Sequence, residues 1–573
     1  TTWVSGTVQA TASSHSGGKI EILGKNVGLI DNASIDASGE SGGGEILIGG
    51  DYLGSNDEVK NAKGTFVAET VEIKADAITN GDGGKVIVWS DEATRMYGQI
   101  FARGGAEGGN GGFIETSGLY LDLGDYVPDA SSPFGIGGEW LIDPFNLTIQ
   151  TAGADDNSGT TPNFVAGASG AILTTGSIET ALNLGTSVTI ATNGGGSEAG
   201  NITINDDIAK TAGGDATLTF NADSQILRTT ALNTDETLNI ASTVGKLNLA
   251  FNAATIFGGT GTGVLTLNLD ANGGVITFPS LSTSNVDASI SGATTVATLT
   301  TYYGLNGPAV VTFNDNLTAT DMVLSGISIV DLNGAANTTD NLTLSAGSLG
   351  GTGKLSVSTL VTASSGASSL PSLMDSFTLE TLAGSTTNIA NNFTWNDSSV
   401  WNNAGTINWN NNGAQPRMYL LGTSIFNNQV GGIFNDNTSP TGLTGTSGQC
   451  CAYTSQFINA GTYNKNGTAE HYIQGPKFIN TGVVNVNDGT LHIYSQNNPG
   501  VTDTGDYIVN GTAIINFVGQ RTFSASSSIS STTAILLSPG IGQFYTLPSG
   551  ASILTPDLTI GSGNVVFDAG STF

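Results

Sequence analysis

The sequence predicts an all-β solenoid, a parallel β-helix in the form of an elongated rod, and three observations carry this prediction. Strand-like runs of four to seven residues recur along nearly the whole chain of 573 residues. Gly, Asn, Asp, Ser and Thr separate these runs, and 81 residues are Gly, which supplies the positive φ angles that tight corners need. Similar segments repeat along the chain, and no segment has the pattern of a long amphipathic helix.

The composition excludes several classes of protein. The chain has 47 acidic and only 16 basic residues, for a formal net charge of −31. A nucleic-acid-binding protein needs clustered Lys and Arg for its phosphate contacts, so this class is excluded. No apolar run exceeds four residues, which excludes a membrane-spanning helix. A hydrophobic content of 38%, arranged in short alternating runs, does not fit a disordered chain.

The first 125 residues contain four strands that each begin with Gly-Gly, at 17–22, 43–48, 83–88 and 111–116. The second glycines of these pairs are 26, 40 and 28 residues apart, and the long step contains a polar insertion near 51–64. The underlying period is therefore about 26 residues. One coil of that length cannot bury its apolar face, but stacked coils pair their strands and bury a continuous core.

A second repeat lies near the C-terminus, at 401–408, 457–464 and 478–485, with looser copies that begin at Phe426 and Ile508. In each copy an Asn follows two residues after an inward-facing apolar residue. Stacked coils would place these amides one above another, where they satisfy each other's donors and acceptors. The sequence therefore predicts a structural ladder, with a ligand-binding row as the alternative, made of Asn403, Asn428, Asn459, Asn480 and Asn510.

The spacing of the repeats divides the chain into four parts of one continuous solenoid. Residues 1–125 hold the Gly-Gly-led repeats, and residues 126–164 are expected to form linking coils around the Trp-Leu-Ile-Asp-Pro sequence at 140–144. Residues 165–395 carry less regular copies, and residues 396–573 carry the Asn repeat. We expect the chain to be a segment of a longer protein.

Several long phrases of the N-terminal part resemble a known family. They are IDASG at 35–39, GGGEILIGGD at 42–51, GDGGKVIVWS at 81–90, ARGG at 102–105, GGNGGF at 108–113 and WLIDP at 140–144. This pattern resembles the shaft of filamentous-haemagglutinin-like exoproteins of the two-partner secretion pathway, over roughly residues 15–210. The resemblance implies a right-handed parallel β-helix, secretion to the surface of a Gram-negative-type bacterium through an outer-membrane partner, and a role in adhesion or surface structure. The secretion-domain motif Asn-Pro-Asn-Gly-Ile does not occur in this sequence, so that domain would lie upstream of Thr1.

Residues for catalysis or metal binding are sparse. A β-helix enzyme that acts on polysaccharide needs paired carboxylates, or a base beside Ca²⁺, in a groove. Asp206 and Asp207 form the densest acidic cluster of the middle region and are weak candidates for Ca²⁺. His471 and His492 are 21 residues apart, about one coil, and would stack on one face without other metal ligands at fixed spacing. No catalytic residue and no cofactor other than calcium is indicated.

The two cysteines, Cys450 and Cys451, are adjacent. They fit two free thiols, a strained vicinal disulfide or a link between chains. Tyr302 and Tyr303 form an aromatic pair that would suit a lectin-like surface, although such residues are more often core or rim residues.

The leading hypothesis is a non-enzymatic extracellular protein, a β-helical rod that builds or extends a cell-surface fibre or acts as an adhesin. Its expected partners are other copies of itself, by end-to-end assembly, or a cell, host or glycan surface. The alternatives are a carbohydrate-active β-helix, either a lyase or a hydrolase, and a glycan-binding module.

Overall fold

The computed structural model of the chain describes most of its length. The described residues are 1–152, 162–165, 170–193, 198–228, 235–257, 263–283, 286–301, 303–304, 307–364, 371–390, 392–396, 398–410, 417–438, 444–446, 454–495, 502–539 and 544–573. Cys450, Cys451 and Tyr302 lie outside them.

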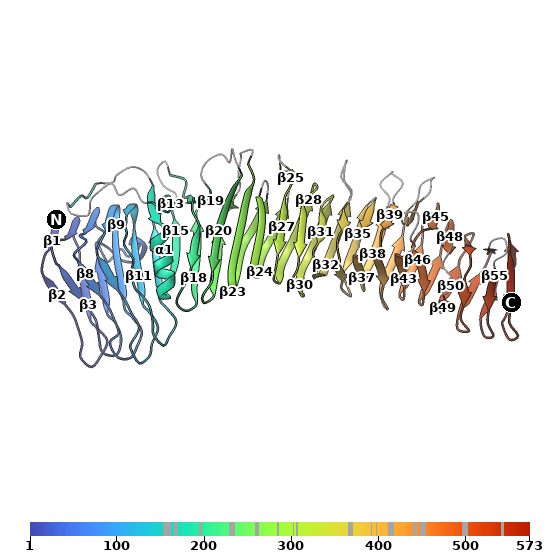
Figure 1. Ribbon diagram of the computed structural model, residues 1–573, viewed down its shortest axis with the longest axis horizontal. Coiled ribbons are helices and arrows are strands. Elements are labelled where there is room, and N and C mark those ends of the chain that lie inside the picture. The colour runs from blue at the N-terminus through green and yellow to red at the C-terminus, as the bar shows by residue number, and fades with distance from the viewer. Residues whose placement is uncertain are drawn as a thin grey trace. The chain divides into compact units, whose positions relative to one another are not determined.

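The fold is all-β, and the predicted fold class is confirmed. Strands hold 57% of the residues and helices 3%, and nearly all pairings between described strands are parallel (Figure 1). The chain divides into two compact units, Thr1–Val296 and Ala297–Phe573, each of which is a stack of β-helix coils. No helix among the described residues is long and apolar enough to cross a membrane.

Unit 1 contains three stacks of parallel strands. The first stack consists of β3 (Lys19–Ile22), β6 (Glu45–Ile48), β9 (Lys85–Met96), β11 (Phe113–Asp122), β12 (Glu139–Asp143), β15 (Ser187–Thr192), β18 (Ala216–Ala222), β21 (Leu247–Asn252) and β23 (Leu265–Thr283). The second consists of β1 (Thr2–Val4), β4 (Asn26–Leu29), β7 (Gly64–Val67), the second halves of β9 and β11, β14 (Ala171–Thr174), β13 (Leu147–Gln150), β16 (Ile202–Ile204), β19 (Gln225–Leu227) and β22 (Thr255–Ile256). The third consists of β2 (Thr7–Gln9), β5 (Ser34–Asp36), β8 (Glu72–Lys74) and β10 (Gln99–Phe101), while β17 (Ile208–Lys210) pairs with β20 (Glu236–Ser242).

The register of the first stack confirms the Gly-Gly repeat. Lys19 pairs with Glu45, Glu45 with Lys85, and Lys85 with Phe113, so the four repeats lie directly one above another. The stack then continues from Phe113 to Glu139 in β12. The Trp-Leu-Ile-Asp part of the segment predicted to form linking coils is therefore a regular rung of this stack.

The sequence pattern did not predict the helix α1 (Thr175–Leu184). The side chain of Thr174 caps its first turn by accepting from the Ser177 N–H at 3.1 Å, and Gly185 ends it with φ 89°. Ile178, Ala181 and Leu182 recur at helical spacing and are buried, and the helix contacts β14, β15 and β17. The apolar stripe is only one turn long, which is too short to stand out in a chain dominated by strand alternation.

Unit 2 is also built from parallel stacks. The first is β28 (Leu317–Ser325), β30 (Asn337–Ser345), β32 (Lys354–Ser364), β34 (Thr378–Thr381), β37 (Val400–Asn403), β40 (Ile425–Asn428), β43 (Gln456–Asn459) and β46 (Lys477–Asn480). The second begins with the second half of β32 and continues with β35 (Thr386–Ala390), β38 (Thr406–Asn410), β41 (Ile433–Asp436), β44 (Thr462–Lys465), β47 (Val483–Val486), β50 (Asp506–Val509), β53 (Ser528–Ser531) and β56 (Ser552–Leu554). The third is β27 (Val310–Phe313), β29 (Ile329–Leu332), β31 (Ser348–Gly350), β33 (Ser372–Leu373), β36 (Phe393–Trp395), β39 (Arg417–Leu420), β42 (Thr444–Thr446), β45 (Glu470–Ile473), β48 (Thr490–Ser495), β51 (Ile514–Gly519), β54 (Ala534–Ser538) and β57 (Asp557–Ile560). A short fourth stack is β49 (Thr502–Asp503), β52 (Thr522–Phe523), β55 (Phe544–Leu547) and β58 (Asn564–Phe567).

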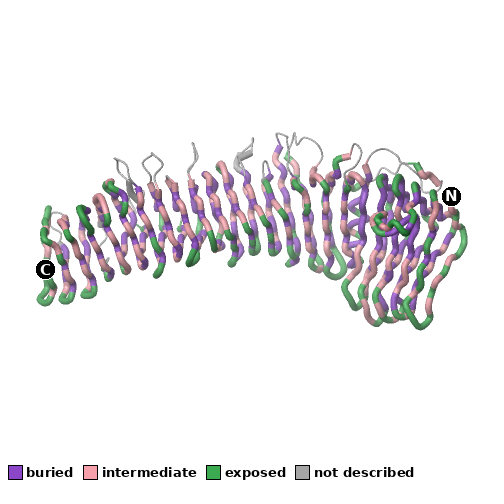
Figure 2. Tube along the Cα trace, turned by 180° about the vertical axis from the view of Figure 1, so that it is seen from behind, coloured by how far each residue is buried: buried purple, intermediate pink, exposed green. Residues whose placement is uncertain are grey.

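The core of each unit follows from strand alternation. Buried residues alternate with partly exposed ones along the strands, as in β43, because successive side chains of a strand point to opposite faces (Figure 2). In unit 2 the inward positions hold stacked aromatic rings, and the rings of Phe434 and Tyr463 lie 5.3 Å apart at an angle of 9°. The inward face supplies the apolar core, so the outward rows of both units are left for polar contacts.

Candidate functional site

Unit 1 has an open groove of about 1160 Å³ that crosses the N-terminal ends of the strands of the first stack. Its floor consists of the glycine pairs that begin each repeat. A Cβ at Gly44 would lie 2.1 Å from the carbonyl oxygen of Gly18, and one at Gly17 would lie 1.7 Å from that of Ala37. Neighbouring backbones therefore approach so closely that only glycine fits, and the floor is bare main chain.

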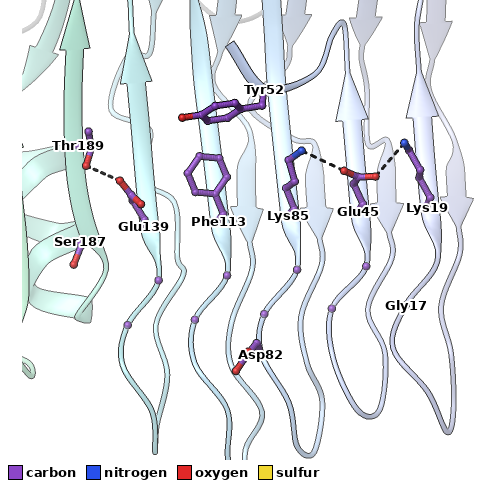
Figure 3. Close-up of a pocket in the computed structure, with 18 of the residues that line it drawn as sticks. Gly17, Lys19, Glu45, Tyr52, Asp82, Lys85, Phe113, Glu139, Ser187 and Thr189 are labelled. Atoms are coloured by element: carbon purple, nitrogen blue, oxygen red, sulfur yellow. Dashed lines mark hydrogen bonds and ion pairs between the residues drawn. The ribbon is translucent and has the colours of Figure 1, made fainter. Parts of the chain in front are cut away.

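A row of charged side chains runs along the groove directly after the glycines (Figure 3). Lys19 lies 3.1 Å from Glu45, and Lys85 lies 3.3 Å from the same carboxylate and 2.9 Å from Asp51. Burial opposes the charge of Lys85, but its hydrogen bonds to Asp51 and Glu45 outweigh this effect and raise its pKa. The row continues at Glu139, which accepts a hydrogen bond from the Thr189 hydroxyl at 2.6 Å. The charges of Lys19, Glu45 and Lys85 are thus compensated from coil to coil.

The polar insertion between β6 and β7, residues 50–63, folds over the outward face of this stack. It contains a short 3₁₀ turn, η1 (Tyr52–Gly54), and its Val59 is buried against Leu47 and Ile87. The ring of Tyr52 lies 5.8 Å from that of Phe113, and both rings border the groove (Figure 3). The insertion therefore creates a small second core outside the coil and adds an aromatic wall to the groove.

Beneath insertion 50–63 lies a carboxylate that the sequence reading missed. Glu115 points outward from β11 but is fully buried, and both of its carboxylate oxygens accept from the Leu53 N–H, at 3.1 and 3.3 Å. Burial raises the pKa of Glu115 to about 7, although the hydrogen bond from Leu53 lowers it in part. Leu53 itself has a left-handed backbone with φ 51°, which is strained for a non-glycine residue.

A second buried carboxylate lies on the next strand. Asp143 of β12 is 4% exposed and accepts from the Asn193 amide at 2.6 Å. Burial raises its pKa to about 6, and its charge in turn raises the pKa of Glu115. A signal for Glu115 was present in the sequence, because the positions in register with it on β6 and β9 are the apolar Leu47 and Ile87. A row of apolar residues on an outward face indicates that the face is covered.

The weak calcium candidates, Asp206 and Asp207, are held by different parts of the chain. Asp206 accepts from the Thr151 N–H at 2.6 Å, and Asp207 accepts from the backbone and the amide of Asn239 at 2.8 and 2.7 Å. Both act as acceptors for neighbouring coils. Among the described residues no group of three or more His, Cys, Asp and Glu side chains could hold a metal ion.

In unit 2 the predicted asparagine ladder joins four of its five members. Asn403 donates to Asn428 at 2.8 Å, Asn428 to Asn459 at 2.8 Å, and Asn459 to Asn480 at 2.9 Å, and all four are fully buried. The prediction is wrong for Asn510. Asn510 was predicted to join this row because it follows an apolar residue by two positions. It comes directly after β50, however, and β50 belongs to another stack.

Asn510 lies at the end of a second, more exposed ladder. It donates to Asn487 at 2.8 Å, and the row continues through Asn466 and Asn437 to Asn410. A third ladder runs from Asn485 through Asn464 and Asn435 to Asn408. In these two outer ladders each amide donates toward the N-terminus, whereas the buried ladder donates toward the C-terminus.

The buried ladder ends on charged groups. The Asn480 N–H donates to Asp503 at 2.9 Å, and Asp503 forms a fully buried ion pair with Arg521 and accepts from the Tyr507 hydroxyl at 2.8 Å.

A second buried polar cluster lies in the same unit, where Asp436 contacts His471 Nδ1 at 2.9 Å. Burial would raise the pKa of Asp436, but the charge and hydrogen bond of His471 lower it to about 2.

The two histidines do not share a face. His471 pairs in register with Leu491 and points into the core, whereas His492 pairs with Tyr472 on the outward side and stacks on its ring at 4.4 Å. The expectation that they stack is wrong because their spacing is one residue longer than the register step, and one residue turns a strand side chain to the opposite face.

Comparison with known proteins adds no family to these findings, since no protein-family model and no curated protein matches the chain. The likeness to filamentous-haemagglutinin-like shafts stays a prediction.

Proposed function

We propose that the chain is a non-enzymatic structural protein or adhesin of the bacterial cell surface, in which β-helix coils build or extend a fibre. The observation that carries the proposal is the continuation of polar rows from coil to coil. In unit 2 these rows are the asparagine ladders, and in unit 1 they are the ion pairs that join Lys19, Glu45 and Lys85. Such rows hold each coil against the next, and the exposed outer ladders keep the outer face hydrated, which suits a shaft.

The resemblance to two-partner-secreted exoproteins supports the location. A secreted protein of this kind would reach the surface through an outer-membrane partner and would contact other copies of itself or a host surface. Brief protease treatment of intact cells, followed by detection of the chain, tests this location. Complete protection of the chain in intact cells, with digestion only after lysis, would contradict it.

The structural role has its own test. Deletion of the coding region should remove surface fibres in electron micrographs or reduce attachment to host cells, and re-expression should restore both. A deletion strain with unchanged fibres and attachment would refute the proposal. Sedimentation velocity over a wide range of concentration then tests end-to-end assembly, which requires species larger than one chain.

A second candidate function is glycan binding in the groove of unit 1. Its support is the bare glycine floor, which lets a flat ligand approach the backbone, and the rings of Tyr52 and Phe113 beside it. Aromatic rings present apolar faces on which sugar rings pack. A glycan array with the Tyr52→Ala variant tests this candidate, and Phe134→Ala is the matched control because Phe134 is 72% exposed outside the groove.

In the same experiment, release of new reducing ends or unsaturated sugars distinguishes a hydrolase or lyase from a binding module. Binding that Tyr52→Ala and Phe134→Ala reduce equally would reject the groove as the site.

A further inference from the structure

Three oxygen-bearing side chains come together on the outward face of unit 1, at the boundary of β11 and β12. Ser117 follows Glu115 by two residues on β11, so both side chains lie on the same face of the strand. Asp143 is the register partner of Ser117 on the neighbouring strand β12. The Ser117 hydroxyl and the Asp143 charge both act on the pKa of Glu115, the hydroxyl lowering it and the charge raising it. The three groups therefore share one small volume.

This volume is closed to solvent. Glu115 and Ser117 are fully buried and Asp143 is 4% exposed. Within the described chain, one carboxylate oxygen of Asp143, Oδ1, makes no hydrogen bond, while the hydroxyl of Ser117 has the Glu115 carboxylate as its hydrogen-bonding neighbour. Buried polar oxygens without a partner are rare, because each costs about 1–3 kcal/mol of desolvation. Such an oxygen on Asp143, beside the Glu115 carboxylate and the Ser117 hydroxyl, points to a ligand that accepts electron pairs.

The charges in this volume are also uncompensated. The charge of Lys85 lowers the pKa of Glu115, but Lys85 is itself engaged by Asp51 at 2.9 Å and Glu45 at 3.3 Å. The other donors to the two carboxylates are neutral, namely the Leu53 N–H and the amide of Asn193. In the part of the chain that the structure describes, no Lys, Arg or His forms an ion pair with Glu115 or Asp143.

We propose that Glu115, Ser117 and Asp143 form a binding site for a hard divalent cation of the calcium class, closed over by insertion 50–63. Two carboxylates and a hydroxyl are oxygen ligands, which such a cation prefers, and its flexible coordination is completed by water or backbone oxygens. The site differs from the calcium candidates Asp206 and Asp207, and it is independent of the adhesin and glycan proposals.

The site couples the cation to insertion 50–63. Glu115 is held by the N–H of Leu53, a residue of the insertion whose backbone has the strained φ of 51°. A cation that neutralises the two carboxylates removes the cost of burying them, so its binding favours the closed insertion. Protons compete for the same oxygens, because burial raises the pKa values of Glu115 and Asp143 to about 7 and about 6. Cation affinity is therefore expected to rise between pH 5.5 and pH 8.

Terbium luminescence tests the proposal directly. Tb³⁺ replaces calcium in oxygen sites, and Trp89 can sensitise it because Trp89 is the register partner of Ser117 on β9, one strand spacing of about 4.8 Å away. We expect the full chain at pH 8 to give tryptophan-sensitised Tb³⁺ emission that excess Ca²⁺ suppresses. The variant Trp89→Phe should lose most of the emission while calorimetry still detects Ca²⁺ binding.

Variants of the ligands complete the test. Asp143→Asn and Glu115→Gln keep the shape of each side chain and should each lower Ca²⁺ affinity by more than roughly tenfold. The double variant Asp206→Asn, Asp207→Asn is the matched control and should bind like the unmodified chain. Circular dichroism and a thermal transition in the absence of Ca²⁺ establish that each variant is folded, and Ser117→Ala provides a third probe if either carboxylate variant is not.

Four results would overturn the proposal. The first is the absence of Ca²⁺ heat and Tb³⁺ emission at pH 8 in the folded, unmodified chain. The second is unchanged affinity in both Asp143→Asn and Glu115→Gln. The third is loss of binding in the Asp206→Asn, Asp207→Asn control alone. The fourth is a thermal transition that rises on acidification but is unaffected by Ca²⁺ at pH 8, which would assign the site to protons only.

Discussion

Removal of one amide from the buried asparagine ladder should destabilise unit 2 much more than removal of one from an exposed ladder. The variant Asn459→Ala breaks three hydrogen bonds, namely the one accepted from Asn428 at 2.8 Å and those donated to Asn480 at 2.9 Å and to the Val483 carbonyl at 3.0 Å. At about 1 kcal/mol net for each bond, the loss is about 3 kcal/mol.

The matched control is Asn466→Ala, since Asn466 directly follows β44, the next strand of the same coil. It also donates to one asparagine and accepts from another, at 2.9 and 2.8 Å, but these bonds are exposed. Water replaces an exposed partner, so we expect a loss below about 1 kcal/mol.

Hydrogen exchange measured by mass spectrometry is the suitable assay, because a stacked array does not unfold in one step. Peptides that cover β43 and β46 should exchange roughly 100-fold faster in Asn459→Ala than in the unmodified chain, as expected for a loss of about 3 kcal/mol in local stability. In Asn466→Ala they should change by less than roughly tenfold. Equal acceleration in the two variants would refute the claim that burial gives the ladder its strength.

Three further predictions concern the carboxylates, the glycine floor and the buried ion pair. Folding raises the pKa of Glu115 to about 7 from its ordinary 4.5. Protonated Glu115 therefore stabilises the fold fully below pH 4.5, and this stabilisation is lost as the pH rises through 7. Without bound cation, the lost stabilisation amounts to about 3 kcal/mol. Urea unfolding of unit 1 at pH 5 and pH 8 should show this slope, and Glu115→Gln should flatten it. Gly44→Ala should disrupt unit 1, since its Cβ would lie 2.1 Å from the Gly18 carbonyl, whereas Gly214→Ala has nothing within 4 Å and should leave the thermal transition unchanged. Asp503→Leu should destabilise unit 2 by about 3–5 kcal/mol, because it removes the carboxylate that pairs with the buried Arg521. The double variant Asp503→Leu, Arg521→Met should recover most of that loss, as measured by urea unfolding. No recovery would argue against the ion pair as the cause of the loss.

The sequence was sufficient for the class of fold and for the first stack. Regular glycine pairs and alternating apolar residues specify both the corners and the inward face, so Lys19, Glu45 and Lys85 are placed in register by spacing alone. The same reasoning located the buried ladder from Asn403 to Asn480. It failed at Asn510, because a spacing of two residues from an apolar position recurs in every stack and does not say which stack a strand joins.

The candidate sites were less accessible to sequence reasoning. The burial of Glu115 and Asp143 depends on insertion 50–63 folding back over an outward face, which is a long-range contact with no local pattern. The alternation rule assigns Glu115 to solvent, but the apolar Leu47, Ile87 and Leu141 in the same row contradict that assignment. The helix α1 was missed for a related reason, since its caps, Thr174 and Gly185, are residue types that the whole chain uses in turns.

The opposite directions of the asparagine ladders have an electrostatic consequence. Each side-chain amide carries a dipole, and identical dipoles aligned through many coils would sum to a field along the stack, as peptide dipoles do along a helix. In unit 2 the buried ladder from Asn403 donates toward the C-terminus, while the outer ladders that end at Asn485 and Asn510 donate toward the N-terminus. The inner row therefore offsets part of the dipole of the outer rows, so the separation of charge between the two ends of the array is smaller than ladders of one direction would produce.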